Sequence, residues 1–460
     1  MGAGQIRMAM TAAEQLAAHF TSLRLSAIPK NIQADVKVLI RDYLGVALGG
    51  SRTDSGQIAA KFAEQTGGTP EATLIGRNGA KVPAVNAAFA NAIASHSIEL
   101  DDVDILALFH FSPPVISAAL AAAERVGATG EAFLTACIAG CEMMARVSDA
   151  TNPSLRNRAY HTTPTTGVFG ATIAAALLLG LDEEQTVSAL GMAGAQASGL
   201  MEMYGPSMQK RFNPGPAARN GVTAAVMAQL GFTGAATILD GERGFCRAFS
   251  DVFDLAELTV GLGTDFPIYI EYKAYSCARP IHNAIDCALS VRKELTEPTA
   301  AITSMVMRRH PDWAHYHLNK APETYHEAQV SLPYSVAVAL IEGAALLPQY
   351  QNEKLRDPEI LRLSNMLIIE TDPGLPRGVS CYLTVETQGG AKLTSQVDHP
   401  RGSIANPMTP AEMDFKVHML ADPVLGEAGV TRMIEATRKL ELLTSIDQLT
   451  SLLVPNLALA

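Results

Sequence analysis

Mainly α is the fold class that the sequence predicts, with a smaller α+β unit between about residues 269 and 400. Through most of the first 260 residues, apolar side chains recur at the three- and four-residue spacing of helices. Between 269 and 400, short runs alternate between apolar and polar residues, as half-buried strands do. From Thr409 the helical pattern returns and continues, with short polar breaks, to the last residues.

Length and composition indicate a globular protein with a large core. The chain has 460 residues, of which 48% are hydrophobic and 18% are charged. Its formal net charge is −11, and no run of basic residues offsets that charge locally, so we expect no nucleic-acid partner. The longest apolar run, 168–181, is too short to span a bilayer, so we expect no membrane partner either.

Cysteine usage and the N-terminus predict a cytoplasmic protein. No signal-peptide pattern precedes Thr11. Cys137 and Cys141 lie four residues apart, but no nearby His or Cys pair completes a metal site. We therefore interpret the six cysteines as small buried residues in a reducing compartment.

The helical part begins at a capping box formed by Thr11 and Glu14, and a second box is predicted at Asp182 and Gln185. Residues 66–82, rich in Gly, Thr and Pro, are expected to be irregular. Alanine is so frequent that we expect helices packed closely in an all-α bundle. Further helices are expected at about 83–98, 114–126, 131–148, 164–180, 183–198 and 216–230.

The α+β unit is expected to contain at least four strands. The run 302–307 alternates like a strand, and 366–370 is a second candidate. Residues 379–387 and 391–397 flank Gly389-Gly390 and predict a hairpin. Helical patterns at about 280–295 and 330–346 separate these strands.

A basic stretch, Lys210-Arg211, stands before the break Pro214-Gly215 and the small-residue helix that follows. Free amides at a helix start, with cations beside them, attract carboxylates or phosphates. The alternative is a structural loop that caps a packed helix. A second stretch, His96 to Asp104, carries four acids that could bind metal, act as bases or form a solvated loop.

Three further histidines each introduce a predicted helix. His110 precedes a proline-started helix, His161 precedes the apolar helix at 164–180, and His282 follows Arg279 at the entry to the α+β unit. A helix N-terminus lowers the pKa of a nearby imidazole, which leaves it neutral and able to act as a base. Phe109 and Phe111 flank His110 and predict an apolar pocket wall.

Other site patterns are weak or missing. The sequence shows no serine-nucleophile elbow, P-loop or dinucleotide fingerprint. His315-x-His317 has metal-ligand spacing but no obvious acidic partner. We expect neither a metal nor another cofactor.

Taken in order, these stretches resemble the MmgE/PrpD family over nearly the whole chain. The resemblance rests on 91–102, on His110, on 161–182, on 210–221, on 231–234 with 241–249, and on Tyr275 to His282 with Ile285-Asp286. It implies an all-α domain built from residues 1–268 and 401–460, with an α+β lid domain at 269–400 inserted between them. It also implies a cofactor-independent active site between the domains, and a homodimer.

Carried over residue by residue, the resemblance implies His110, His161, Lys210 and His282 as catalytic residues. Glu99 and Tyr334 are added as substrate-binding residues, and Arg279 would clamp a carboxylate with its guanidinium. Family members share proton transfer at a carbon next to a carboxylate. The leading expectation is therefore a 2-methylcitrate dehydratase-like hydro-lyase on a small di- or tricarboxylate.

Several alternatives remain open from the sequence. Decarboxylation of a cis-aconitate-like acid and epimerisation use similar intermediates. A non-catalytic helical binding protein and a metal-dependent hydrolase that uses the acids at 99–104 belong to other classes. Many family members carry Asp where Glu99 stands and His where Asn213 stands, which leaves the substrate and the separate role of each histidine open.

Overall fold

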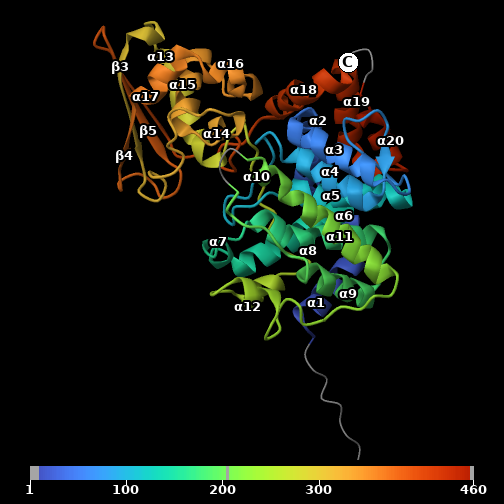
Figure 1. Ribbon diagram of the computed structural model, residues 1–460. Coiled ribbons are helices and arrows are strands. Elements are labelled where there is room, and N and C mark those ends of the chain that lie inside the picture. The colour runs from blue at the N-terminus through green and yellow to red at the C-terminus, as the bar shows by residue number, and fades with distance from the viewer. Residues whose placement is uncertain (1–9, 204–206, 456–460) are drawn as a thin grey trace, which may run out of the picture.

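The structure, a computed structural model, describes residues 10–203 and 207–455. It confirms a mainly α protein with some strands, and the larger sheet lies at one end of the molecule (Figure 1). The N-terminal part contains α1 (Ala12–Ser22), α2 (Lys30–Gly50), α3 (Asp54–Thr66), α4 (Ala84–Ser95), α5 (Ser112–Val126), α6 (Gly130–Thr151), α7 (Ser154–Asn157), α8 (Thr162–Leu178), α9 (Glu183–Gly194), α10 (Gln209–Phe212), α11 (Pro214–Gln229) and α12 (Phe245–Phe249).

Side chains cap the helices at the two predicted capping boxes. At α1, the Thr11 hydroxyl accepts a hydrogen bond from the Glu14 amide at 3.2 Å, and the Glu14 carboxylate accepts one from the Thr11 amide at 2.7 Å. Asp182 and Gln185 make the same reciprocal pair at α9, at 2.8 and 3.2 Å. Each box satisfies amides that a helix start leaves free. Both predictions are confirmed.

Small residues let α6 and α8 approach each other almost backbone to backbone. A Cβ atom added to Gly170 would lie 2.5 Å from the carbonyl oxygen of Gly140, and one added to Gly140 would lie 2.8 Å from that of Gly170. Helix α8 is buried along nearly its whole length, so apolar or small residues occupy all its faces. The closely packed helical bundle expected from the alanine content is present here.

The C-terminal helices return to the N-terminal ones. Helix α18 (Pro410–Leu425) lies against α2 and continues into α19 (Glu427–Arg438) and the short α20 (Asp447–Thr450), red beside blue in Figure 1. One hydrophobic core joins side chains of 12–268 to side chains of 417–453. This shared core supports the division 1–268 plus 401–460, which stays a prediction.

Four strands form one mixed sheet in the order β4-β3-β5-β6. Strand β3 (Ile302–Arg309) runs parallel to β4 (Leu367–Thr371) and antiparallel to β5 (Cys381–Thr387). Strand β5 pairs with β6 (Lys392–Val397), which confirms the predicted hairpin. A separate core connects the sheet to its neighbouring helices. These helices are α13 (His282–Glu294), α14 (Tyr325–Ala328), α15 (Leu332–Glu342), α16 (Asn352–Leu355) and α17 (Pro358–Met366).

Two connections differ from the sequence predictions. Residues 66–82, expected to be irregular, contain the short antiparallel strands β1 (Ala72–Thr73) and β2 (Lys81–Val82). Residues 231–260 belong to the part of the chain expected to be mainly helical, but they hold only α12 and a 3₁₀ turn at Leu255–Leu258. Glycine disfavours helix interiors and explains this break. Four glycines stand in the stretch, at 231, 234, 241 and 244.

Among the described residues, every helix is either too short or too polar to span a membrane. The prediction that no signal peptide precedes Thr11 concerns residues 1–9, which lie outside the described part of the chain.

Candidate active site

Five of the seven residues that the sequence singled out line one small pocket of about 80 Å³. It lies where the loop after α4, the starts of α5 and α8, the short α10 and the segment before α13 meet. The lining residues are Glu99, Val103, Leu108, His110, Arg156, His161, Lys210, Lys273, Ala278, Arg279, Pro280, Trp313 and His317.

The acidic loop after α4 is buried and paired. Asp102 accepts hydrogen bonds from two amides at the start of α5, at 2.7 and 3.1 Å. Asp104 accepts from two amides of its own turn, at 2.8 and 3.0 Å. Glu99 and Asp101 instead face cations and histidines, and each is 1% exposed. A solvated loop is therefore the wrong interpretation of this stretch.

Glu99 gathers three cations at the pocket. Lys210 and Arg211 both contact its Oε1, and Lys273 donates to its Oε2 at 3.0 Å. Lys273 also donates to Asp101 at 3.1 Å. Lys273 is therefore paired with two carboxylates, whereas Lys210 shares the single carboxylate of Glu99 with two other cations.

Burial and these contacts together lower the pKa values of Glu99 and Lys210 and raise the pKa of Lys273. Burial alone would raise the pKa of Glu99, but Lys210, Lys273 and Arg211 outweigh it and hold that pKa well below its ordinary value. Burial lowers the pKa of Lys210 to about 8, although Glu99 opposes the change. Burial would also lower the pKa of Lys273, but Asp101 and Glu99 raise it above the usual range. Lys210 is therefore the lysine of this group that can lose its charge near neutral pH.

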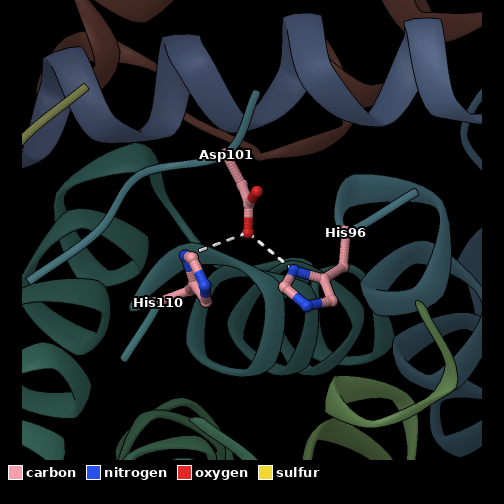
Figure 2. A group of neighbouring side chains, drawn as sticks. All are labelled: His96, Asp101 and His110. Atoms are coloured by element: carbon pink, nitrogen blue, oxygen red, sulfur yellow. Dashed lines mark hydrogen bonds and ion pairs between the residues drawn. The ribbon is translucent and has the colours of Figure 1, made fainter. Parts of the chain in front are cut away.

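Asp101 holds two histidine rings on one carboxylate oxygen (Figure 2). Its Oδ2 lies 2.6 Å from Nδ1 of His96 and 3.2 Å from Nδ1 of His110. Nδ1 of His110 also contacts the carbonyl oxygen of Asp102. The ring of His110 is thereby fixed through one nitrogen, while Nε2 has no hydrogen-bond partner among the described residues.

The same three side chains offer metal-ligand atoms within 4.8 Å of one another. Their present partners fit hydrogen bonding better than metal binding. Asp101 already accepts from His96 and Lys273 and lies close to His110, and Lys273 and Lys210 place positive charge beside the group. A divalent cation there would meet like charges at close range.

The catalytic histidines expected from the sequence are neutral. Burial lowers the pKa of His110 to about 3, against the attraction of Asp101. Burial, followed by nearby histidines and Lys210, lowers the pKa of His161 well below its ordinary value. The expected direction is confirmed, but burial rather than a helix N-terminus is the largest cause. Both imidazoles can accept or donate a hydrogen bond without carrying charge.

Two arginines of the pocket have guanidinium N–H groups without a hydrogen-bond partner among the described residues. One guanidinium nitrogen of Arg279 donates to Glu271, whereas its buried Nε and Nη1 have no hydrogen-bond partner in the described residues. Arg156, on α7, lines the pocket and makes no hydrogen bond or ion pair with its side chain in the same residues. A buried donor without a partner is costly, so the Arg279 nitrogens are suited to an anionic ligand, and the half-buried Arg156 adds a second guanidinium to the same pocket.

Backbone strain gathers around the pocket. Four non-glycine residues in the described chain have positive φ: Glu99 (55°), Leu108 (57°), Ala159 (65°) and His317 (67°). Three of them line the pocket, and Ala159 stands two residues before His161. Left-handed backbone costs free energy and persists where the surrounding structure enforces it, often at functional sites.

Two of the expected site residues lie elsewhere. His282 is fully buried beside the pocket rather than lining it, with Nε2 directed to the carbonyl oxygen of Cys277 at 3.2 Å. Tyr334 lies in the core of the sheet-bearing part, where its hydroxyl donates to the carbonyl oxygen of Gln349 at 2.7 Å. Its side chain is needed for packing, so the structure does not support Tyr334 as a substrate-binding residue.

Phe109 and Phe111 do not form the apolar pocket wall expected from the sequence. Both are completely buried in the helical core, and their rings pack edge to face at 4.6 Å. Consecutive side chains point in different directions, so both phenylalanines pack into the core while His110, between them, reaches the pocket. The pocket wall is more polar than predicted.

No sequence pattern singled out Arg156, Lys273 or Trp313, which also line the pocket. Lys273 stands two residues before Tyr275, at the edge of a stretch that did attract notice. Arg156 and Trp313 occur in no pattern that suggests a site. Only the folded chain brings these residues from distant segments to one cavity.

Fold and pocket together define a mainly α protein with a buried pocket that is lined by cations and histidines. The MmgE/PrpD N-terminal domain matches residues 14–258, and the MmgE/PrpD C-terminal domain matches residues 275–442. The chain belongs to the MmgE/PrpD family, as its motifs indicated.

Similar proteins include three that are named cis-aconitate decarboxylase. The protein of Mus musculus is 25% identical, with 97% of this chain and 94% of the relative covered. That of Homo sapiens is 26% identical, with 96% and 94% covered. That of Aspergillus terreus is 27% identical, with 94% of each chain covered.

Proposed function

We propose that the protein is a cofactor-independent lyase that acts on a small di- or tricarboxylate. The observation that carries this proposal is the pocket itself, in which Lys210, Arg156 and Arg279 surround two neutral histidines, His110 and His161. Cations hold carboxylates, and a neutral imidazole can take a proton from carbon. Family membership and the names of the relatives support the same class of reaction.

The chemistry requires stabilisation of negative charge at a carbon next to a carboxylate. Removal of a proton or of carbon dioxide from such a carbon leaves an enolate, whose charge lies on the carboxylate oxygens. Lys210 supplies a point charge for these oxygens, and the free nitrogens of Arg279 suit a second carboxylate. A buried pocket strengthens each of these interactions, because little water screens them.

Decarboxylation of a cis-aconitate-type acid is our first candidate. From the motifs alone, we expected 2-methylcitrate-like dehydration to lead. The relatives that match over nearly their full length carry the decarboxylase name, which favours loss of carbon dioxide. Dehydration stays the second candidate. It needs the same base and the same cations, because a β-hydroxyl group is lost from an enolate that the cations stabilise.

The test is incubation of the purified protein with cis-aconitate, citrate, 2-methylcitrate and tartrate, followed by proton NMR in D₂O. Loss of carbon dioxide, loss of water and inversion give different products, and solvent deuterium marks the carbon that exchanged its proton. We expect turnover of a tricarboxylate. Tight binding of these acids without any conversion would instead indicate a binding protein, and would overturn the lyase proposal.

Metal analysis tests the cofactor-independent mechanism. We expect unchanged turnover after chelation and no stoichiometric metal in the purified protein. Metal at one equivalent, with turnover that chelation abolishes, would favour the metal-dependent hydrolase considered from the acids at 99–104.

A further inference from the structure

We propose that Asn213 is a positioning residue that fixes His161 as a neutral hydrogen-bond donor, while Asp101 and the Asp102 carbonyl fix His110 as the base. The two rings line the same pocket but would present opposite groups to the substrate. This assignment separates the roles of the two histidines, which the sequence left open.

The contact of Asn213 determines the proton position on His161. Nδ2 of Asn213 lies 3.0 Å from Nδ1 of His161 and 3.0 Å from the Met203 sulfur. An amide nitrogen only donates, and a thioether sulfur only accepts, so this orientation satisfies both neighbours. The flipped amide would place its oxygen against the sulfur. Nδ1 of His161 therefore accepts, and the ring proton lies on Nε2.

The partners of His110 produce the opposite tautomer. Its Nδ1 faces two acceptors, the carbonyl oxygen of Asp102 and Oδ2 of Asp101. Neither the carbonyl nor an ionised carboxylate can donate, so Nδ1 carries the proton. Nε2 of His110 is left with a free lone pair, and the ring lines the pocket. Burial lowers the pKa of His110, but the Asp101 carboxylate opposes this change, whereas every charged neighbour of His161 lowers the pKa of that ring further, so His110 is the better suited of the two to receive a proton.

The catalytic part of this inference rests on the proposed function. For loss of water or inversion, the C–H bond next to a carboxylate breaks, the proton goes to Nε2 of His110 and the electron pair stays on the substrate as an enolate. For loss of carbon dioxide, the C–C bond to the departing carboxylate breaks and leaves its electron pair as an enolate, which takes a proton from Nε2 of a His110 that solvent has protonated. The Nε2–H of His161 then donates a hydrogen bond to the enolate oxygen. The Asn213 amide neither takes up nor releases a proton, so His161 cannot relay one through Nδ1. It remains an electrophile, and proton transfer belongs to His110.

Nitrogen-15 NMR of the histidine rings tests the tautomers directly, without a substrate. With nitrogen-15-labelled histidine, we expect His161 to show a protonated Nε2 and a bare Nδ1, and His110 to show the reverse. Loss of signals in the His161→Gln and His110→Gln variants assigns them. A wild-type spectrum with the proton on Nδ1 of His161 overturns the inference, whatever acid the protein converts.

The Asn213→Asp variant tests the link to catalysis. An aspartate accepts from Nδ1–H, so the proton should leave Nε2 of His161 and the donor should be lost from the pocket. We expect kcat to fall about 10²–10³-fold, as for loss of one oxyanion donor, with a much smaller change in KM. Asn220→Asp on the same helix makes the same charge change away from the pocket and should leave both the His161 signals and kcat unchanged.

The outcomes separate this inference from the proposed function. If Asn213→Asp moves the His161 proton and keeps the wild-type kcat, the donor role is wrong although the lyase proposal stands. If no acid is converted but the wild-type tautomers are as expected, the lyase proposal fails and the positioning role of Asn213 stands. The wild-type spectrum decides that role even if Asn213→Asp fails to fold.

Discussion

Glu99 determines how charge is distributed around the pocket, because three cations converge on its one carboxylate. Lys273 has a second carboxylate in Asp101, and Arg211 has a further acceptor in Gln329 at 2.9 Å. Among the described residues, Lys210 pairs with Glu99 alone. At the scale of single residues, Lys210 is therefore the cation that a substrate carboxylate can recruit most readily.

Replacing Lys210 tests this assignment. We expect Lys210→Ala to lower kcat/KM by about 10²–10³-fold, because a buried cation that stabilises developing negative charge is lost. Steady-state kinetics on the acid that the protein converts measures the effect. Lys439→Ala, which removes an exposed lysine of the C-terminal part, is the matched control and should leave kcat/KM unchanged. Equal activity of both variants would contradict the role of Lys210.

The pH dependence of kcat/KM should report the same residue. The pKa of Lys210 is lowered to about 8, so its positive charge is complete at lower pH and is lost as pH rises through that value. We therefore expect kcat/KM to decrease above about pH 8. Lys210→Arg retains charge at this pH and should lack that decrease, even if its maximal rate is lower. An unchanged alkaline limb in the variant would assign the titration to another group.

At the scale of elements, the sequence predicted those helices and strands whose ends carry strong local signals. The capping boxes at Thr11 and Asp182 and the turn at Gly389-Gly390 are of this kind. Short helices such as α7 and α10 were not predicted, because one turn stabilises too few hydrogen bonds to leave a pattern. These are also the elements that bring Arg156 and Lys210 to the pocket. The sequence drew attention to Lys210 through the basic stretch before a helix start and through the family motif, and no such signal marked Arg156.

The close contact between α6 and α8 predicts that one methyl group added at the contact lowers the stability of the protein. In Gly170→Ala, the new methyl would overlap the Gly140 carbonyl oxygen, and we expect a loss of about 1–3 kcal/mol in the free energy of unfolding. Urea unfolding followed by circular dichroism measures it. In Gly374→Ala, the added methyl approaches only a side-chain oxygen of Asp372, at 3.1 Å, so a change within about 0.5 kcal/mol is expected. Similar midpoints for both variants would contradict the close packing.

At the scale of the whole molecule, the pocket depends on contacts between the helical part and the sheet-bearing part. Gln329 donates to the carbonyl oxygens of Ile98 and Ser276, each at 3.0 Å, and accepts from Arg211. Such contacts join residues far apart in the sequence, and no local pattern encodes them. This explains why the family motif names Tyr334 together with His110 and His161, although only the two histidines line the pocket.

The homodimer implied by the family resemblance is also a property of the whole molecule. We expect light scattering after size-exclusion chromatography to give twice the mass of one chain. A mass of one chain over a wide concentration range would contradict it.

Lys416 comes late in the chain but contacts the acidic loop of the pocket, so we expect this loop to become ordered only after α18 has been synthesised. It lies on α18, donates to the carbonyl oxygen of Leu100 at 2.6 Å and pairs with Asp42 at 2.7 Å. Leu100 stands between Glu99 and Asp101, so a lysine that leaves the ribosome 316 residues later fixes the acidic loop. We expect nascent chains stalled before α18 to expose this loop to proteases, although they already contain every residue that lines the pocket, and released chains to protect it.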